Sequence, residues 1–585
     1  MARTQRRDTY PQRLKKSHIT ATSNKVQPPW SGQNVWRWLL TFYDEQQLQD
    51  IQKAWVLDTE EAKDAKNTIA TPFKTLHLVA CLSPQQGQAQ HLDPGFHRLE
   101  VGLDAPLLTR QVLLTLCVGQ VADTLKELEF EADVVSLHAT ATPWNRWTVQ
   151  ALARCCRRGT QVWVESHAES QEAEPSLMVL LSQAGFVAQA SPSQTAPQTA
   201  ATPNTPPQTS ALSAPALSYT YDPQWDIKTQ RRIWRSPAQE PGHCTVLGAG
   251  LAGASVAYAL ARRGWRVLVL DAASMPAAGA SGLPAGLMAP QDSRDDSPRS
   301  RLIRAGIELT HQHAQRLLIE GQDWAPTGVM TLQMAEDLAD NRTETWHPSG
   351  AWIRPGQLVR AWLAHPLITF QGHTYVARIS HEGPQSWKLW DTQDQLINTS
   401  SCVVLANAGG AFELAKTCTT PLTKLPAMEQ LQGVLSWGYR EAEDPNFAMH
   451  PVNGYGSLIP KFPMPEGWAW ITGATYEVPR NELELQQHHQ HNLERLRQLQ
   501  PRTAEALSEN FEQNHVQHWV GTRCVNSKRL PCVGSLEASG LWIHAALGSR
   551  GLSLSALGAE LLASRIGAEP WPLPKDLAQH LMVDG

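Results

Sequence analysis

The sequence lacks any long apolar run. No stretch approaches the roughly 20 consecutive apolar residues that a transmembrane helix needs. The first sixteen residues are basic and polar, and they lack the apolar core of a secretory signal. We therefore expect a cytoplasmic protein that does not associate with a membrane.

Cysteine is scarce, and the nine cysteines form no CxxC pair. An odd count without such pairs argues against a disulfide framework and against a cysteine zinc site. The histidine-rich stretch Gln486–Asn492 offers no convincing spacing of histidine with carboxylate. We interpret it as a solvated helix and expect no metal site.

Charge is also modest, at 18% charged residues and a net charge of −5. This balance excludes a strongly basic nucleic-acid coat but not a local basic patch. The first 30 residues are basic and predict a flexible charged tail. The 42% hydrophobic content excludes wholesale disorder, and 585 residues predict about three to five domain-sized units.

One stretch without charge divides the chain. Ala190–Ser218 is rich in Pro, Thr, Ser, Ala and Gln, so it cannot bury enough apolar surface to order itself. We predict a linker and connector over residues 190–240. It separates an N-terminal domain at 31–189 from a C-terminal domain at 241–585.

The N-terminal domain alternates strand and helix patterns. This alternation predicts a doubly wound α/β sheet. The predicted strands are Val35–Phe42, Leu76–Leu82, Val112–Val118, Asp133–Leu137 and Thr160–Glu165, and the predicted helices are Glu45–Trp55, Trp147–Arg157 and Pro175–Ala184.

A dinucleotide-binding fingerprint follows the linker. A short apolar strand, Cys244–Leu247, runs into a GxGxxG turn formed by Gly248, Gly250 and Gly253. A helix, a second strand and Asp271 come next, which is the context that this fingerprint requires. The glycines permit a tight turn and a close approach of backbone to a pyrophosphate, and Asp271 is placed to accept hydrogen bonds from ribose hydroxyls.

Further motifs identify a family. They are VLGAGLAGASVAYALARRGW (246–265), GASG (279–282), VVLANAGG (403–410), GATYE (473–477), GTRCVNSKRLPCVG (521–534), ALGSRGLSLSALGAELLAS (546–564) and EPWPLP (569–574). Through them the C-terminal domain resembles the FAD-dependent amine oxidases related to glycine, sarcosine and D-amino-acid oxidases. It is more similar still to the oxidoreductase half of the bifunctional tRNA 5-methylaminomethyl-2-thiouridine biosynthesis proteins.

The resemblance implies a fold, a cofactor and a set of site residues. The fold is an FAD-binding Rossmann domain with an inserted α+β substrate domain of the glycine and D-amino-acid oxidase type. The implied FAD-binding residues are Gly248, Gly250, Gly253, Asp271, Ser281, Gly282, Val376, Ala406, Asn407, Gly548, Gly551 and Leu552.

Two arginines match positions at which the relatives receive the substrate carboxylate, Arg523 and Arg550. A guanidinium binds a carboxylate bidentately and stays charged, so it can orient the substrate for oxidation. Leu283, Ala408 and Lys528 depart from the family pattern, and Leu283 and Lys528 leave the exact substrate open.

The N-terminal domain resembles the family's Rossmann-like methyltransferase domain, but its site is altered. The glycine-rich loop that would cradle S-adenosylmethionine is replaced by Tyr43–Gln47, which contains no glycine. The second strand ends in Cys81-Leu82-Ser83, where an acidic residue would hold the ribose, and another acid is replaced near His138. We predict a degenerate domain that does not use S-adenosylmethionine.

Together these features predict an FAD-dependent oxidoreductase that acts on a tRNA wobble uridine. It would remove the carboxymethyl group of 5-carboxymethylaminomethyl-uridine and leave 5-aminomethyl-uridine. Two alternatives stay open at this point. One is an oxidase of a free small amine of the glycine or sarcosine type, and the other is a non-catalytic tRNA-binding scaffold with a structural FAD.

Overall fold

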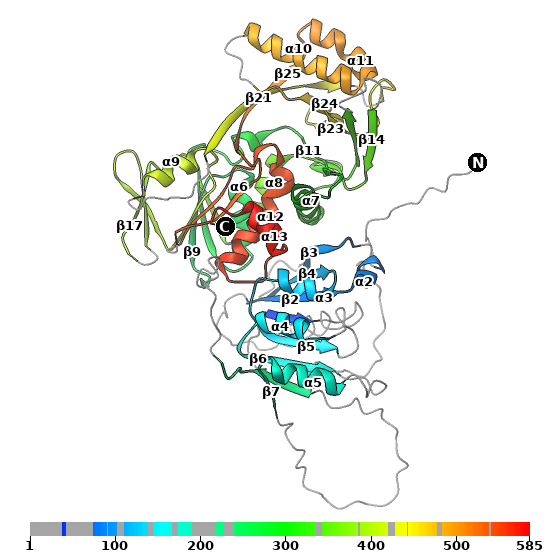
Figure 1. Ribbon diagram of the computed structural model, residues 1–585. Coiled ribbons are helices and arrows are strands. Elements are labelled where there is room, and N and C mark those ends of the chain that lie inside the picture. The colour runs from blue at the N-terminus through cyan, green and yellow to red at the C-terminus, as the bar shows by residue number, and fades with distance from the viewer. Residues whose placement is uncertain are drawn as a thin grey trace, which may run out of the picture. The chain divides into compact units, whose positions relative to one another are not determined.

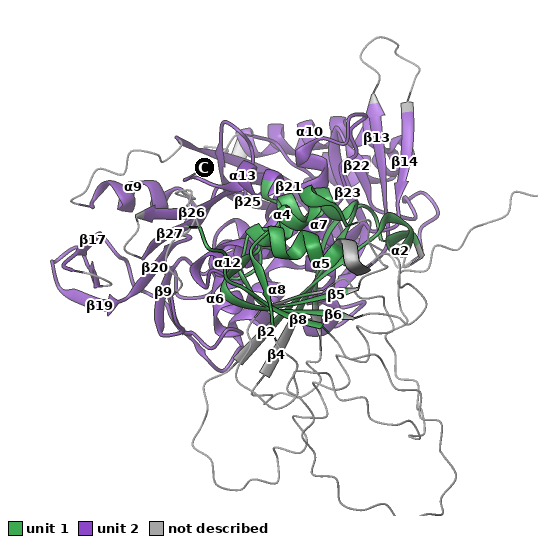
Figure 2. Ribbon diagram, turned by 60° about the horizontal axis from the view of Figure 1, so that its bottom comes forward, with its two compact units in different colours: residues 1–232, 569–575 green, residues 233–568, 576–585 purple. Residues whose placement is uncertain are grey.

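The computed structural model describes residues 38–41, 74–89, 92–101, 110–138, 144–165, 174–189, 217–225, 239–334, 342–383, 386–418, 427–440, 443–476, 482–537 and 540–584. The chain folds as two compact units (Figures 1 and 2). Unit 1 comprises Met1–Arg232 and Glu569–Lys575, and unit 2 comprises Ile233–Ala568 and Asp576–Gly585. No helix within the described ranges is long and apolar enough to cross a membrane.

Unit 1 is a mixed eight-stranded sheet in the order β3-β4-β2-β1-β5-β6-β8-β7. Its five inner strands, from β4 to β6, run parallel, as the sequence predicts for a doubly wound sheet. The strands are β1 (Trp38–Thr41), β2 (Lys74–Leu82), β3 (Gly95–Val101), β4 (Arg110–Val118), β5 (Ala132–His138), β6 (Cys156–Glu165), β7 (Phe186–Ala188) and β8 (Leu217–Tyr221).

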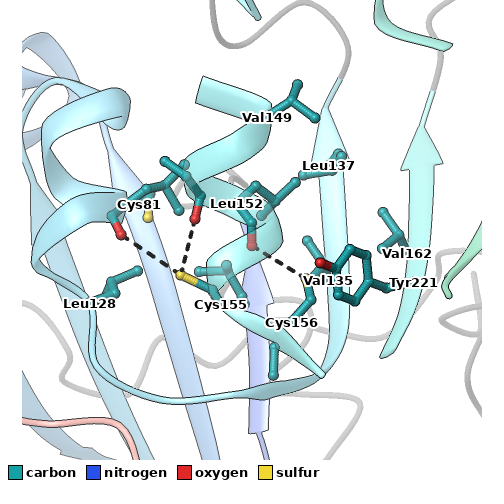
Figure 3. Close-up of a cluster of buried hydrophobic side chains, with 14 of the residues drawn as sticks. Cys81, Leu128, Val135, Leu137, Val149, Leu152, Cys155, Cys156, Val162 and Tyr221 are labelled. Carbon is teal, nitrogen blue, oxygen red and sulfur yellow. Dashed lines mark hydrogen bonds between the residues drawn. The ribbon is translucent and has the colours of Figure 1, made fainter. Parts of the chain in front are cut away.

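Alternating side chains give each face of this sheet its own core. Val79 and Cys81 point to one face, and Leu78 and Ala80 belong to the cluster on the other. Figure 3 shows the first core, where Cys81 and Val135 pack with residues of α4. The helices of unit 1 are α2 (Pro84–Ala89), α3 (Val121–Glu127), α4 (Arg146–Arg154) and α5 (Glu174–Gln183).

Two sequence predictions need correction in unit 1. Helix α4 ends at Arg154, not Arg157, because Cys156 already pairs with Ala132 in the sheet. Strand β8 lies inside the predicted linker and connector. Its residues Tyr219 and Tyr221 are buried, and they fix the strand antiparallel between β6 and β7. The predicted helix Glu45–Trp55 lies outside the described residues.

The C-terminal segment Glu569–Lys575 completes unit 1. Nε2 of His77 lies 3.2 Å from a carboxylate oxygen of Glu569, and Nη2 of Arg98 donates a hydrogen bond of 2.6 Å to the carbonyl oxygen of Pro570. The indole of Trp571 is buried. This segment therefore packs as part of the N-terminal unit, although the sequence analysis includes it in the predicted C-terminal domain at 241–585.

Unit 2 contains a six-stranded sheet in the order β16-β10-β9-β20-β27-β26, parallel except for β26. The strands are β9 (His243–Leu247), β10 (Arg266–Leu270), β16 (Ile368–Gln371), β20 (Cys402–Leu405), β26 (Cys532–Glu537) and β27 (Leu541–Ala545). The helices associated with it are α6 (Leu251–Ala261), α7 (Pro298–Leu317), α8 (Pro355–Leu363), α9 (Gly410–Lys416), α12 (Gly551–Ile566) and α13 (Lys575–Leu581).

Helices α6 and α12 are apolar on nearly every side and are buried along their whole lengths. One carboxylate, that of Glu560 on α12, is buried between them. Its oxygens lie 2.5 Å from Arg262 and 3.0 Å from Arg263, at the end of α6. Because a buried charge is tolerated only when it is paired, this triad fixes how α12 packs on α6.

The second large sheet of unit 2 has seven strands in the order β14-β13-β22-β23-β24-β21-β25. They are β13 (Val329–Met334), β14 (Arg342–His347), β21 (Met428–Arg440), β22 (Val452–Gly454), β23 (Gly456–Met464), β24 (Gly467–Gly473) and β25 (Gln517–Asn526). Two three-stranded sheets complete the unit: β11 (Gly286–Met288), β15 (Ala351–Ile353) and β12 (Trp324–Ala325), and β17 (Arg378–His381), β18 (Trp387–Trp390) and β19 (Leu396–Ser400).

Helices α10 (Glu482–Leu499) and α11 (Pro501–Glu512) lie across this sheet (Figure 1). The prediction of a solvated helix is wrong for His488 and His489, which are both buried. Nδ1 of His489 lies 2.7 Å from the hydroxyl of Ser436, and burial, aided by His518, lowers the pKa of His489 to about 4.

Candidate active site

The glycine turn between β9 and α6 is built so that no side chain fits in it. Gly248 has a φ of +101°, and a Cβ there would lie 2.7 Å from the carbonyl oxygen of Ala406. A Cβ on Gly253 would lie 1.8 Å from the carbonyl oxygen of Gly248, so this glycine permits helix and turn to meet. A Cβ on Gly250 would meet the hydroxyl of Ser281 at 3.0 Å.

Asp271 and Ser281 hold this turn in place. The carboxylate of Asp271, at the end of β10, accepts hydrogen bonds from the amides of Ala249, at 2.7 Å, and Ala273, at 2.8 Å. The hydroxyl of Ser281 accepts from the amide of Leu251, the first residue of α6, at 2.9 Å. The first turn of α6 therefore faces the cavity with its amide groups ordered, which is the arrangement that favours a phosphate.

A cavity of about 1280 Å³ lies in unit 2 beside this turn. It brings together most of the residues that the sequence predicts for the site. Those that line it are Gly248, Gly250, Asp271, Ser281, Val376, Ala406, Asn407, Gly548, Gly551, Leu552, Arg523 and Arg550. Gly253 and Gly282 do not line it, since each glycine packs closely against backbone, Gly282 against the carbonyl of Ala277.

The cavity walls fit a long nucleotide cofactor such as FAD. Gly248 and Gly250 present bare backbone to the cavity, and the cavity volume exceeds that of ordinary small-ligand pockets. Oδ1 of Asn407 is buried and has no hydrogen-bond partner among the described residues. A polar atom of this kind, facing a cavity, is the acceptor that a bound cofactor with N–H or O–H groups would satisfy.

Arg523, on β25, has one terminal guanidinium nitrogen that is hydrogen-bonded and one that is not. Its Nη1 donates a hydrogen bond of 2.9 Å to the hydroxyl of Ser549, whereas its Nη2 is buried without a hydrogen-bond partner in the described chain. Burial lowers the pKa of Arg523 from its usual value, and the nearby Tyr476 opposes that shift. The guanidinium still carries its charge at neutral pH, so it can receive an anion.

Arg550, in the short 3-10 helix Gly548–Arg550, faces the same cavity. Its Nη2 donates to the side-chain oxygen of Gln291 at 2.8 Å. Burial, and in second place the neighbouring charge of Arg299, lowers the pKa of Arg550 to about 10. Arg299 and Arg550 both line this cavity, and two cations in one cavity make a carboxylate a favourable ligand there.

The cavity as a whole is cationic. Its described lining residues include five arginines: Arg299, Arg495, Arg523, Arg529 and Arg550. They include one acid, Asp271, which is already engaged with backbone amides. This imbalance suits a cofactor or substrate that carries negative charge.

Sequence reasoning missed several lining residues. Arg299 lies in the first turn of α7, Arg495 lies on α10 and Trp519 lies on β25. Tyr476 follows the end of β24. None belongs to a local spacing pattern. The one signal in the sequence was Tyr476 itself, which belongs to the family motif GATYE.

The altered methyltransferase positions are only partly described. Tyr43–Gln47 lies outside the described residues, and of the segment near His138 only the strand end is described. At the end of β2, Cys81 is buried. Ser83 and Gln86 exchange hydrogen bonds between backbone and side chain, which starts α2 directly after the strand.

The described residues contain no cluster of potential metal-ligating side chains. No group of three or more His, Cys, Asp or Glu side chains there is arranged to hold an ion.

Comparison with known proteins links this geometry to named relatives. Residues 243–345 and 332–565 match the family described as FAD dependent oxidoreductase. A protein of Albidiferax ferrireducens named tRNA 5-methylaminomethyl-2-thiouridine biosynthesis bifunctional protein MnmC is 38% identical over 591 residues, which cover 94% of this chain and 93% of the relative. The protein of that name from Paracidovorax citrulli is 34% identical, covering 95% of this chain and 92% of the relative. Among solved structures, glycine oxidase from Geobacillus kaustophilus matches at 18% identity with a TM-score of 0.45, over 56% of this chain and 94% of that one.

Proposed function

Because this chain belongs to the MnmC family and, through residues 243–565, to the FAD-dependent oxidoreductases that act on CH–NH groups, we propose that it oxidises the 5-carboxymethylaminomethyl group of a wobble uridine in tRNA. Its product would be 5-aminomethyl-uridine. The unit-1 methyltransferase activity would be absent.

The observation that carries this proposal is the unsatisfied Nη2 of Arg523. Its Nη2 is buried and unsatisfied within the same cavity that the glycine turn borders. A secondary amine that bears a carboxylate matches this site, because the carboxylate can engage Arg523 and Arg550 while the C–N bond extends into the cavity. The names of the relatives, which are tRNA 5-methylaminomethyl-2-thiouridine biosynthesis proteins, support tRNA as the substrate.

The residues divide the work between cofactor and substrate. Gly248, Gly250 and the first turn of α6 would hold the pyrophosphate of FAD, with Asp271 near its ribose. Bound FAD supplies an acceptor for the two electrons of the C–N bond. Arg523 and Arg550 would fix the carboxylate, and so the orientation of the carbon that loses its hydrogen.

The overall reaction balances without a protein nucleophile. The CH₂–NH bond of the carboxymethylamino group loses two electrons and two protons and becomes an imine. Water then adds across the C=N bond and cleaves it. The carbon fragment leaves as glyoxylate, and the nitrogen stays on the uridine as the aminomethyl group.

For unit 1 we propose a retained sheet without methyl transfer. The position after β2, where a ribose-binding acid is expected, is used by Ser83 to start α2. No carboxylate follows this strand until Asp93. Without that acid, the two ribose hydroxyls of S-adenosylmethionine lose their usual acceptor. The domain boundaries near 30, 190 and 240 belong to the same proposal.

One experiment separates the main proposal from its alternatives. The purified full chain is reduced anaerobically with tRNA that carries 5-carboxymethylaminomethyl-uridine, and separately with glycine and with sarcosine. We expect the flavin to bleach with the tRNA at concentrations where the small amines have no effect. Bleaching by the small amines alone would identify a free-amine oxidase, and no bleaching by any of the three would indicate a scaffold.

Nucleoside mass spectrometry provides the matching test in cells. In a strain that lacks the gene, 5-carboxymethylaminomethyl-uridine should accumulate in tRNA, and the full-length gene should restore its loss. An unchanged nucleoside profile would refute the proposal.

A further inference from the structure

Two tyrosines and one arginine form a stack at the edge of the cavity, where Arg495 and Tyr476 line it and Tyr455 lies between the lining residues Gly454 and Gly456. Arg495 lines the cavity from α10, and its guanidinium carbon lies 5.1 Å from the ring centroid of Tyr455 and 5.4 Å from that of Tyr476. Both distances are within the range of a cation–π contact. The guanidinium is fixed further, because its Nη1 donates to the carbonyl oxygen of Ala474. We call Tyr455, Arg495 and Tyr476 the tyrosine–arginine stack.

The stack continues to the carboxylate anchor. The guanidinium carbon of Arg523 lies 5.3 Å from the ring centroid of Tyr476. Tyr476 therefore touches Arg495 and Arg523. A molecule held against this ring would lie next to the open Nη2 of Arg523.

Both rings of the stack face solvent to an unusual degree. Tyr455 is 60% exposed and Tyr476 is 58% exposed. Large aromatic rings normally bury their faces, since burial contributes most of their stabilising effect. Tyr455 is presented by a tight turn between β22 and β23, where Gly454 and Gly456 both line the cavity and Gly456 has a φ of +116°. Ordered rings with exposed surface are the typical platform for a planar ligand.

We propose that the tyrosine–arginine stack binds the pyrimidine ring of the modified uridine after that base has left the stack of the anticodon loop. This inference rests on the proposed function and assigns the base-holding residues of the same site. Proteins that recognise single-stranded RNA stack unpaired bases on aromatic rings and on guanidinium planes. A free small amine has no such ring, so the stack would select tRNA over glycine.

The length of the substrate side chain agrees with this placement. From C5 of the uracil ring to the carboxylate carbon there are four single bonds, which span roughly 5 Å when extended. The contact between Tyr476 and Arg523 spans 5.3 Å. The two lengths are similar, so the substituent of a base held beside Tyr476 can extend toward Arg523.

Direct RNA binding tests the inference without catalysis. The full-length protein is titrated, at one fixed salt concentration, into a fluorescent anticodon stem-loop that carries 5-carboxymethylaminomethyl-uridine. We expect Tyr455→Leu and Arg495→Gln each to raise Kd about tenfold, which is the usual effect of losing one base-stacking contact. Tyr455→Phe keeps the ring and should keep the wild-type Kd.

Tyr439→Leu serves as the matched control. Tyr439 is an exposed tyrosine of the same sheet, 38% accessible, whose ring contacts Trp437, whereas Arg495 lies over the rings of Tyr455 and Tyr476. It should leave Kd unchanged. Bound flavin per protein is measured for every variant, and it should equal that of wild type because the stack is assigned to the substrate.

The outcomes distinguish the stack from the proposed function. If wild type binds the stem-loop and bleaches with modified tRNA, but Tyr455→Leu and Arg495→Gln bind as wild type does, the stack is refuted and the proposed function stands. The stack is also refuted if Tyr455→Phe loses as much affinity as Tyr455→Leu. If wild type bleaches with glycine or sarcosine and not with tRNA, both proposals are overturned.

Discussion

Replacing Arg523 by alanine tests the substrate anchor directly. The structure gives the expected size of the effect. Nη1 of Arg523 is already bonded to Ser549, so the substrate carboxylate is expected to engage Nη2, which has no hydrogen-bond partner in the described chain. A hydrogen bond between charged groups contributes about 1.5–3 kcal/mol, so removing it should weaken substrate binding by roughly 10- to 150-fold.

The assay is anaerobic reduction of the bound flavin at increasing concentrations of the modified tRNA. Arg523→Ala should purify with a normal flavin content, because Arg523 is assigned to the substrate and not to FAD. Its half-saturating tRNA concentration should rise, and Arg523→Lys should recover little, because an ammonium cannot reproduce the planar fork of a guanidinium.

A matched arginine outside the cavity serves as the control. Arg378 on β17 also stacks on an aromatic ring, that of Trp390 at 4.9 Å, and pairs with Asp394 at the surface. Arg378→Ala should leave the titration unchanged. If Arg523→Ala and Arg550→Ala both titrate as wild type does, the carboxylate anchor is wrong.

Three further predictions concern the cofactor, unit 1 and pH. Gly250→Val should purify with little flavin, because its side chain would press on Ser281 and occupy the approach to the pyrophosphate; a variant as yellow as wild type would contradict the cofactor placement. Calorimetry of the full chain with S-adenosylmethionine should show no binding at micromolar concentrations, and methylated aminomethyl-uridine as a product would restore a bifunctional enzyme. Burial lowers the pKa of His544 to about 4 from 6.5, so the unfolded chain binds a proton that the folded one excludes. Stability should therefore be complete above pH 6.5 and fall by up to about 3 kcal/mol toward pH 4. Urea titrations should show a flatter pH dependence for His544→Gln, and an unchanged slope would show that His544 is not responsible.

The dinucleotide fingerprint could be predicted from the sequence because it is local. The predicted second strand is present as β10 (Arg266–Leu270), and β9 begins one residue before the predicted Cys244. In this segment, glycine spacing, strand patterns and the acid at the strand end are all read within about 25 residues. No distant contact is needed to recognise them.

The tyrosine–arginine stack could not be predicted in the same way. Tyr455, Tyr476, Arg495 and Arg523 come from a turn, a strand end, a helix and another strand. Only the pairing of β22, β23, β24, β21 and β25 brings them together. Isolated tyrosines and arginines are common at surfaces, so nothing in the sequence alone distinguishes these four.

The predicted boundaries of α4 and of the linker were wrong, because pairing with a neighbouring strand outweighed the local sequence pattern. Cys156 and Arg157 continue the helical pattern of α4, yet Cys156 pairs with Ala132 in the sheet. The hydroxyl of Thr160 also donates a hydrogen bond to the carbonyl oxygen of Ala132. Similarly, the polar composition that predicts a linker extends over Leu217 and Ser218, which belong to β8. In both cases the neighbouring strand decided the structure.

The return of Glu569–Lys575 to unit 1 has a consequence for biosynthesis. Trp571 is buried and Pro570 accepts a hydrogen bond from Arg98. Both residues reach the ribosomal exit only after Ile233–Ala568 of unit 2 has been translated. At roughly 5–20 residues per second, Met1–Arg232 emerges on the order of tens of seconds earlier. The N-terminal unit therefore spends this interval without its final segment, and its packing is completed only when Glu569–Lys575 has emerged.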